Sequence, residues 1–290
     1  LGSAGAMAAV SVLGFTPLAK ADEPKSLPDY AAWKERNALI VHSANTMETQ
    51  RGAIGNGVIT SSDRLFVRNN LPAPPASVTD NPDAWEVRIE GVKNPRTLTV
   101  GDLKQMGVTT VASVLQCSGN GRAFFPHGAS GTQWSVGAAG CIMWTGVPLK
   151  DVVEALGGPV DGTRYITSTG GETLPDGLDP KTIIVERSVP TRAMETALLA
   201  WEMNDEPLTH THGEKVDVSV DGGKTWKQAR FLGPDLGPYA WRPFVLAADL
   251  AAGEHRIVSR ATDVQGNTQP EGRTENERGY GHNGWSDHGV

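Results

Sequence analysis

Cys117 is the residue of this chain whose neighbours most clearly suggest chemistry. It follows a β-branched, strand-like run over residues 109–116 and opens the turn Cys117-Ser118-Gly119-Asn120-Gly121-Arg122. A thiolate between a strand and a glycine-rich turn is a soft ligand for a transition metal, or a nucleophile. The chain also contains Cys141. Spacing alone therefore leaves three alternatives open for Cys117: a disulfide with Cys141, a buried inert thiol or a functional thiol.

Three further side chains could bind an oxyanion. Arg68 lies near the end of a short predicted strand over residues 64–70, and Arg122 lies five residues after Cys117. The planar guanidinium group binds sulfate-like and phosphate-like oxygens bidentately. Trp134 could offer its indole N–H to the same anion. The alternatives are solvated surface positions for the two arginines and core packing for the tryptophan.

Other motifs give weaker or no support for chemistry. A zinc site from the pair His210 and His212, or from His282 and His288, is possible, but the spacing favours it little. The sequence contains no Cys-x-x-Cys, no G-x-S-x-G and no P-loop. A dinucleotide fingerprint is also absent. Iron–sulfur, nucleotide and serine hydrolase chemistry therefore have no support.

Composition limits the class of protein. The chain has 290 residues, which corresponds to about two domains. A hydrophobic content of 39% and a charged content of 20% exclude wholesale disorder. The net charge of −7 argues against a nucleic-acid partner, because such a footprint is basic.

The first 21 residues resemble an export signal. The apolar stretch over residues 6–15 is too short to span a bilayer, and it leads to the small-x-small site Ala19-Lys20-Ala21. No later window holds 18 consecutive apolar residues. We therefore expect an exported protein without a membrane span.

The elements that must position these residues are of mixed type. We predict helices over residues 27–38 and 147–156, a short helix after Thr99, and strands over residues 64–70, 85–92, 109–116 and 182–186. Residues 192–201 are apolar and of helical or extended type. This mixture, without a repeating βαβ rhythm, indicates an α+β domain.

The last 78 residues have a different pattern. Strands are predicted over residues 215–220, 225–231, 244–246 and 255–261, and Asp221-Gly222-Gly223 forms a hairpin turn between the first two. This is typical of an immunoglobulin-like β-sandwich. Such domains run to about 100 residues, so one or two strands are expected to be missing from its start.

Four motifs occur together in one order, and they resemble the sulfite oxidase family of molybdopterin oxidoreductases. They lie at residues 65–72 (LFVRNNLP), 115–122 (LQCSGNGR), 144–149 (WTGVPL) and 199–208 (LAWEMNDEPL). Residues 218–226 and 261–263 resemble the dimerisation domain of the same family. The likeness is greatest to exported, haem-free bacterial sulfite dehydrogenases.

The resemblance implies a fold, a cofactor and site residues. The fold is an α+β molybdopterin-binding domain over residues 22–212, followed by an immunoglobulin-like β-sandwich dimerisation domain over residues 213–290. Cys117 corresponds to the cysteine whose sulfur binds molybdenum. Arg68, Arg122 and Trp134 correspond to substrate-anion contacts, and Arg278 corresponds more loosely to a further arginine from the sandwich domain. The residues matched to pterin contacts are Phe66, Val67, Arg68, Asn69, Asn70 and His212.

Two departures from the family pattern stand out. Asn70 occupies a position where many relatives carry histidine. At Gly213-Glu214 the chain passes almost directly into the sandwich strands, whereas relatives continue through a substantial segment with further pterin-binding residues and an active-site tyrosine. The resemblance thus implies that a stretch near residue 213 is missing, either because the sequence shown omits it or because the gene is truncated.

The function implied is molybdenum-dependent oxidation of sulfite to sulfate in the periplasm. An external c-type cytochrome is implied as electron acceptor, because no Cys-x-x-Cys-His haem site is present. The resemblance to the dimerisation domain implies a second copy of the chain as a further partner. One alternative is a molybdopterin reductase of methionine sulfoxide or another oxyanion. The other is a truncated, non-catalytic association module.

Overall fold

A computed structural model describes residues 26–54, 57–69, 80–168, 177, 187–204, 215–219, 222–237, 239–248, 250–263 and 265–290. For residues 187 and 215–219 it describes the backbone alone. The predicted export signal, the predicted strand over residues 182–186, Asn70 and His212 lie outside these ranges.

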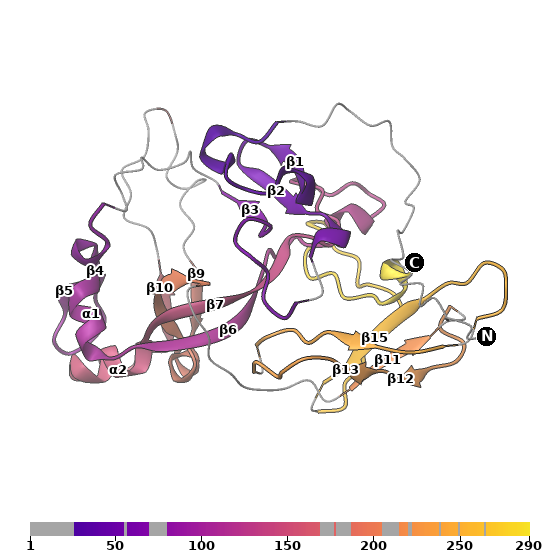
Figure 1. Cartoon of the computed structure of the whole chain (residues 1–290). Helices are drawn as coiled ribbons and strands as arrows, with labels where there is room; N and C mark the ends of the chain where they lie inside the picture. The colour runs from indigo at the N-terminus through magenta and orange to yellow at the C-terminus, as the bar shows by residue number, and fades with distance from the viewer. Residues whose placement is uncertain are drawn as a thin grey trace, which may run out of the picture.

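A three-stranded antiparallel sheet positions the cysteine turn. Strand β7 (Ala139–Pro148) lies between β6 (Thr109–Gln116) and β10 (Leu198–Met203) (Figure 1). The predicted strand over residues 109–116 is confirmed as β6, which pairs with β7 along its whole length. Because β6 ends at Gln116, Cys117 is the first residue beyond the sheet.

Two short helices pack against one end of this sheet. Helix α1 (Val100–Met106) begins with a capping box between Thr99 and Asp102, and α2 (Leu149–Ala155) confirms the helix predicted over residues 147–156. The left-handed Gly157 and Gly158 follow α2. The core here consists of Val92, Leu98, Leu103, Val147, Val152, Val153 and Leu156.

Shorter strand pairs complete the first domain. The pair β4 (Glu86–Ile89) and β5 (Arg96–Thr99) confirms part of the strand predicted over residues 85–92. Residues 192–201 contain both predicted types, with η7 (Thr191–Glu195) leading to β10. The remaining short elements are η3 (Arg51–Ala53), η5 (Pro82–Ala84), η6 (Arg122–Phe124), β8 (Tyr165–Ser168) and β9 (Arg187–Pro190).

The N-terminal segment forms a second three-stranded sheet. Its order is β1 (Leu39–Ser43), β2 (Thr46–Thr49) and β3 (Val67–Arg68). The strand predicted over residues 64–70 is thus reduced to two residues.

The continuous helix predicted over residues 27–38 is wrong. Two single-turn 3₁₀ helices, η1 (Asp29–Ala31) and η2 (Arg36–Ala38), replace it. Between them, Lys34 Nζ donates hydrogen bonds to the carbonyls of Ser62 and Leu65, and the amide of Glu35 donates to Asp63. These tertiary contacts hold the chain in a form that a continuous helix could not take.

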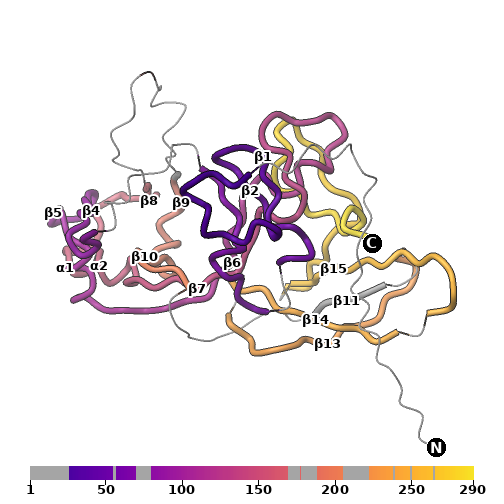
Figure 2. Tube along the Cα trace, turned by 45° about the horizontal axis from the view of Figure 1, so that its top comes forward, coloured from indigo at the N-terminus to yellow at the C-terminus, as the bar shows by residue number. Residues whose placement is uncertain are grey.

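The C-terminal residues form two small antiparallel sheets. Strand β11 (Lys215–Ser219) pairs with β12 (Lys227–Gln228) and β15 (Val258–Thr262), and β13 (Arg230–Phe231) pairs with β14 (Phe244–Val245). The strands predicted over residues 215–220 and 244–246 correspond to β11 and β14. The strand predicted over residues 225–231 is divided between β12 and β13, which lie in different sheets, and the one predicted over residues 255–261 is shifted to β15. The chain then returns to the first domain and ends after η8 (Ser286–His288), where the carbonyl of His288 accepts a hydrogen bond from Arg51. The yellow C-terminal segment lies beside the magenta loop that follows β6 (Figure 2).

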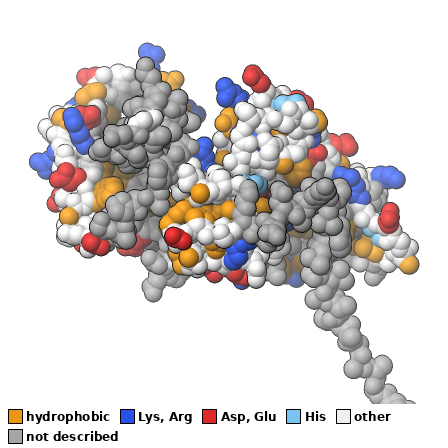
Figure 3. All heavy atoms as spheres, turned by 90° about the horizontal axis from the view of Figure 1, so that it is seen from above, with side chains coloured by type: hydrophobic (Ala, Val, Ile, Leu, Met, Phe, Trp, Pro, Cys, Tyr) orange, Lys and Arg blue, Asp and Glu red, His pale blue; other side chains and the backbone are white. Residues whose placement is uncertain are grey.

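The surface carries charges of both signs. One face shows hydrophobic side chains towards its middle and Lys, Arg, Asp and Glu side chains scattered around them (Figure 3). Within the described residues, no helix is long and apolar enough to cross a membrane.

Candidate active site

A cavity of about 1120 Å³ lies beyond the end of β6. Its walls come from four parts of the chain: the N-terminal segment with β3, the end of β6 with the cysteine turn and the following loop, Met203 at the end of β10, and the C-terminal segment. Eight of the ten predicted site residues line it, and the other two, Asn70 and His212, lie outside the described residues. The eight are Phe66, Val67, Arg68, Asn69, Cys117, Arg122, Trp134 and Arg278.

The structure separates the two cysteines. Both are free thiols, so the disulfide alternative is wrong. Cys141 is buried in β7, and burial raises the pKa of its thiol, which suits an inert side chain. Cys117 is partly exposed and lines the cavity. Of the two, Cys117 is therefore the thiol available to a ligand.

The turn that carries Cys117 is fixed by the neighbouring loop. The amide of Cys117 donates to the carbonyl of Ala138 at 2.9 Å, and the amide of Gly121 donates to Ser135 at 2.7 Å. Gly121 has φ +85°, a left-handed conformation that favours glycine. A Cβ at this position would also lie 2.6 Å from the side chain of His282.

Arg122 presents a buried positive charge to the cavity. It is 5% exposed, and it donates from Nε to the carbonyl of Arg278 and from Nη1 to the carbonyl of Thr132, both at 3.1 Å. The ring of Tyr280 lies 4.8 Å from its guanidinium carbon. No carboxylate within the described residues lies within ion-pair distance of Arg122. A buried cation held by neutral carbonyls favours an anionic ligand.

Other basic side chains add positive charge to the cavity. Arg68 and Arg278 are exposed side chains that line the cavity, and Lys34 lines it beside Ser62 and Leu65. Burial lowers the pKa of Lys34 to about 8. None of the described lining residues is Asp or Glu. In a chain of net charge −7, this cavity is a local positive region.

Trp134 is a packing residue in the cavity wall. It is 1% exposed, and its ring meets His42 and Phe66 edge-on, with centroids 5.2 and 6.3 Å away. It belongs to a core with Leu65, Phe66, Ala138 and Ile142. Its surroundings match the core-packing alternative, and direct contact with an anion stays a prediction.

The described residues give no support for the zinc alternative. His282 and His288 are neighbours, with ring centroids 4.9 Å apart, but His282 Nε2 is paired with Asp287 at 2.8 Å. Among the residues that the structure describes, no group of three or more His, Cys, Asp or Glu could hold a metal ion. His210 and His212 lie outside those residues.

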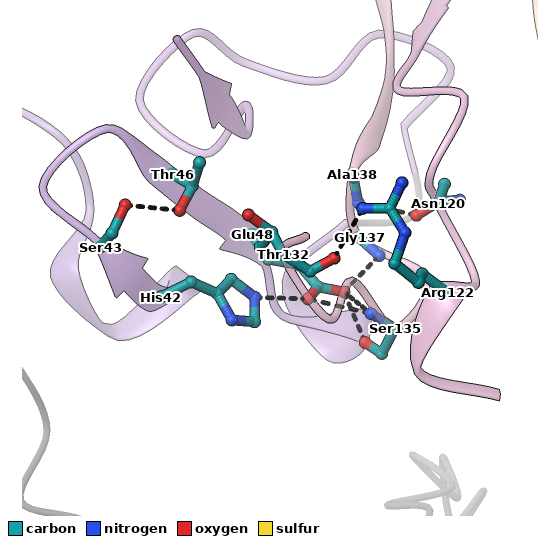
Figure 4. A network of polar contacts seen from close by, with 10 residues as sticks. All are labelled: His42, Ser43, Thr46, Glu48, Asn120, Arg122, Thr132, Ser135, Gly137 and Ala138. Carbon is teal, nitrogen blue, oxygen red and sulfur yellow. Dashed lines mark hydrogen bonds and ion pairs between the residues drawn. The ribbon is translucent and has the colours of Figure 1, made fainter. Parts of the chain in front are cut away.

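Sequence reasoning missed three residues at this site: Lys34, Tyr280 and Glu48. Lys34 and Tyr280 line the cavity. Glu48 is buried in β2, and its carboxylate accepts hydrogen bonds from Ser135, the residue after the lining residue Trp134 (Figure 4). The sequence gives one signal for Tyr280: it lies two residues after Arg278, which the family resemblance assigns to the site. A single glutamate in a short strand has no sequence signal that separates it from a surface residue.

Two sequence families account for most of the chain. The oxidoreductase molybdopterin binding domain matches residues 73–233, and the Mo-co oxidoreductase dimerisation domain matches residues 211–289. The two matches overlap over residues 211–233, and the predicted domain boundary falls inside that overlap. The two matches, in the predicted order of domains, define an oxidoreductase of the molybdopterin class.

Individual relatives show which family within the molybdopterin oxidoreductases the chain resembles. The chain is 30% identical to the mitochondrial sulfite oxidase of Drosophila melanogaster over 207 residues, which cover 68% of this chain and 35% of that protein. It is 30% identical to the sulfite oxidase of Arabidopsis thaliana over 185 residues, 60% of this chain and 46% of that protein. The chain belongs to the sulfite oxidase family of molybdopterin oxidoreductases.

The likeness extends to other enzymes. The NADPH nitrate reductase of Aspergillus niger is 28% identical over 216 residues, 72% of this chain and 24% of that protein. The chain thus spans less than half the length of these relatives. The crystal structure of the sulfane dehydrogenase SoxCD from Paracoccus pantotrophus superposes with a TM-score of 0.61 at 19% identity, covering 89% of this chain and 87% of that one. That similarity confirms the fold.

The cavity fits the cofactor that the family implies. The thiol that lines it is that of Cys117, and no multi-residue metal site lies among the described residues. This donor set suits a metal that takes its other ligands from an organic cofactor. The basic and amide side chains around the cavity suit the anionic pterin.

Proposed function

We propose that this protein oxidises sulfite to sulfate at a molybdenum–molybdopterin centre. The observation that carries the proposal is the shared cavity of Cys117 and Arg122, in which a free thiol lies beside a buried cation without a carboxylate partner in the described residues. The overall reaction is sulfite plus water giving sulfate, two protons and two electrons. When bound, the cofactor supplies this two-electron chemistry.

The residues of the chain bind the cofactor and orient the substrate. The Cys117 thiolate is the protein ligand of the metal, and the segment from Phe66 to Asn69 contacts the pterin, together with Asn70 and His212. Arg122 and Arg68 bind the oxygens of sulfite and stabilise the charge of the dianion in a partly dehydrated cavity. Arg278 extends this anion site from the C-terminal segment.

The decisive experiment compares the two cysteines. Full-length protein with Cys117→Ser should lose bound molybdenum and sulfite oxidation with ferricyanide as acceptor. Cys141→Ser is the matched control, because that thiol is buried away from the cavity lining. Molybdenum-dependent sulfite oxidation that survives Cys117→Ser would refute the proposal. A wild-type protein without molybdenum or pterin would favour the non-catalytic alternative.

Nitrate reduction is a second candidate, because a nitrate reductase is among the relatives and nitrate is also an oxyanion. A cationic cavity of this kind would accept either anion. Assays with sulfite plus ferricyanide, against nitrate or methionine sulfoxide plus a reduced dye, separate oxidation from reduction. Activity with the reduced dye alone would replace sulfite oxidation as the proposed function.

The cellular setting is part of the same proposal. We place the protein in the periplasm as a homodimer that passes electrons to a separate c-type cytochrome. The match to a dimerisation domain over residues 211–289 supports the dimer, and the signal-like residues 1–21 support export. Sedimentation showing a monomer at high concentration, or an unprocessed N-terminus in a cell extract, would contradict these points.

A further inference from the structure

We propose that Glu48 is a positioning residue of the anion site, which holds Cys117 and Arg122 in place through the loop of residues 132–138. The proposal deepens the proposed function, on which its sulfate measurement rests. Glu48 lies on β2, and its side chain is 1% exposed. The family likeness assigns Glu48 no role: it is matched neither to the metal-binding cysteine nor to a substrate or pterin contact.

The first step is the contact between Glu48 and the loop. The carboxylate accepts hydrogen bonds from the amide of Ser135 at 2.9 Å, from the hydroxyl of Ser135 and from the amide of Gly137 at 2.8 Å (Figure 4). It also accepts one from His42 Nε2 at 2.9 Å. Burial raises the pKa of Glu48, but these hydrogen bonds outweigh burial and lower the pKa. The group is therefore an ionised acceptor at neutral pH.

The second step leads from the loop to the functional turn. The carbonyls of Trp134, Ser135 and Ala138 accept the amides of Ala123, Gly121 and Cys117, at 3.0, 2.7 and 2.9 Å. The amide of Ala138 donates to Asn120 Oδ1 at 3.0 Å. The carbonyl of Thr132 accepts Arg122 Nη1. A shift of the loop must therefore move both the thiol and the guanidinium group.

The third step is the close packing of the β2 backbone against the loop. The amide of Thr49 donates to the carbonyl of Gly137, and a Cβ on Gly137 would overlap the carbonyl oxygen of Thr49. The ring of Trp134 meets His42, which Glu48 also holds. The strand and the loop are thus in direct backbone contact, so the geometry at Glu48 is transmitted to the loop.

The strand that carries Glu48 lies outside the part of the chain that matches the molybdopterin-binding domain. The molybdopterin-binding match begins at residue 73, whereas β1 and β2 lie before it. The hairpin β1–β2 therefore contributes a buried carboxylate to a turn that belongs to the matched range.

The amide isostere isolates this role. Glu48→Gln keeps the size of the side chain but replaces one acceptor oxygen with an NH₂ group that faces backbone donors. At the Oε1 position the NH₂ group would face the amides of both Ser135 and Gly137, and at the Oε2 position it would still face the amide of Ser135, at 3.1 Å. In either orientation the hydrogen bonds from the loop lose the charge of the carboxylate. The loop should shift or loosen, and the turn with it.

The experiment uses the full-length chain and inorganic sulfate as the probe. We expect Glu48→Gln to raise the calorimetric Kd for sulfate at least fivefold. Hydrogen exchange of the peptide covering residues 117–123 should become at least tenfold faster, whereas α2 should be unchanged. Thr145→Val is the control, because Thr145 is a buried hydrogen-bonding residue on β7 that does not line the cavity. It should lower the melting temperature without either change.

The outcomes separate this inference from the proposed function. A folded Glu48→Gln protein with wild-type sulfate affinity and wild-type exchange at residues 117–123 would overturn the positioning role. If Glu48→Gln does not fold, Ser135→Ala removes one donor to the carboxylate, and an unchanged Kd in that variant would overturn it equally. A wild-type protein that binds no sulfate would count against the proposed anion site, while the exchange comparison would still decide the role of Glu48.

Discussion

Arg122 Nε donates a 3.1 Å hydrogen bond to the backbone carbonyl of Arg278, which lies in the C-terminal segment of the chain. The ring of Tyr280 lies against the same guanidinium group, and the amide of Gly281 donates to the carbonyl of Ser118. Residues 278–281 therefore close one side of the cavity over the cysteine turn. The cavity is therefore lined by residues from both matched domains.

The ring of Tyr280 should stabilise the orientation of Arg122. A cation–π contact of this kind contributes about 0.5–2 kcal/mol. We expect Tyr280→Leu to raise the KM for sulfite about fivefold with a small change in kcat. Tyr280→Phe keeps the ring and should stay within about twofold of the wild type. Equal defects in both variants would show that the hydroxyl group, and not the ring, is the important feature.

Arg122 should not tolerate replacement by lysine. A single ammonium group cannot reproduce the planar fork that reaches both Arg278 and Thr132 and still faces a substrate. We expect Arg122→Lys to lower kcat/KM for sulfite about 100-fold, in steady-state assays with ferricyanide. Arg88→Lys, in an exposed pair with Glu90, serves as the control and should be neutral. Near-normal activity of Arg122→Lys would contradict a bidentate role.

Gly121 should be far less replaceable than Gly91, although both have positive φ angles of +85° and +70°. An alanine in the left-handed region costs about 1–2 kcal/mol. A Cβ on Gly91 meets nothing within 4 Å, whereas one on Gly121 would collide with His282. We expect urea unfolding to show a loss of about 1 kcal/mol for Gly91→Ala and of about 2–5 kcal/mol for Gly121→Ala. Similar losses would mean that His282 moves aside freely.

His288 should make the protein sensitive to acid. Burial, followed by the positive charges of His282 and Arg51, lowers the pKa of His288 to about 4, while Asp287 opposes the shift. The contribution is fully present above the ordinary histidine pKa of about 6.5 and is lost as the pH falls towards 4, because only the unfolded state then binds the proton.

The expected slope of this effect is about 1.4 kcal/mol of unfolding free energy per pH unit in that window. His288→Phe keeps an aromatic ring beside Phe124 and cannot titrate. Urea unfolding between pH 7 and 4 should therefore show a flatter pH dependence for the variant than for the wild type. Parallel curves would show that His288 is protonated in the folded state.

The parts of the fold that the sequence predicts well are those decided by local pattern. Residues 109–116 are β-branched and apolar up to a glycine-rich turn, and β6 has the same bounds. The prediction of a helix over residues 27–38 failed because Lys34 and Glu35 donate hydrogen bonds to residues 62–65, a contact that no local pattern reveals.

The residues of the candidate site likewise fall into those that local sequence can predict and those that it cannot. Cys117, Arg68 and Arg122 could be selected from residue type and neighbours, and the structure brings them to one cavity. Arg278 entered only through family likeness, since it is distant in sequence. Glu48 and Tyr280 depend on tertiary proximity alone. Whether the segment near residue 213 is shortened relative to the family stays a prediction, since residues 205–214 lie outside the described ranges.

The hydrogen bond between Arg122 and the carbonyl of Arg278 has a consequence for engineering by recombination. A hybrid protein that exchanges the second domain at the junction would also exchange one wall of the cavity that Cys117 lines. Donor domains should therefore be chosen by whether they can reproduce the turn of residues 276–281 against Arg122. Selectivity among oxyanions could then be tuned by grafting that turn alone.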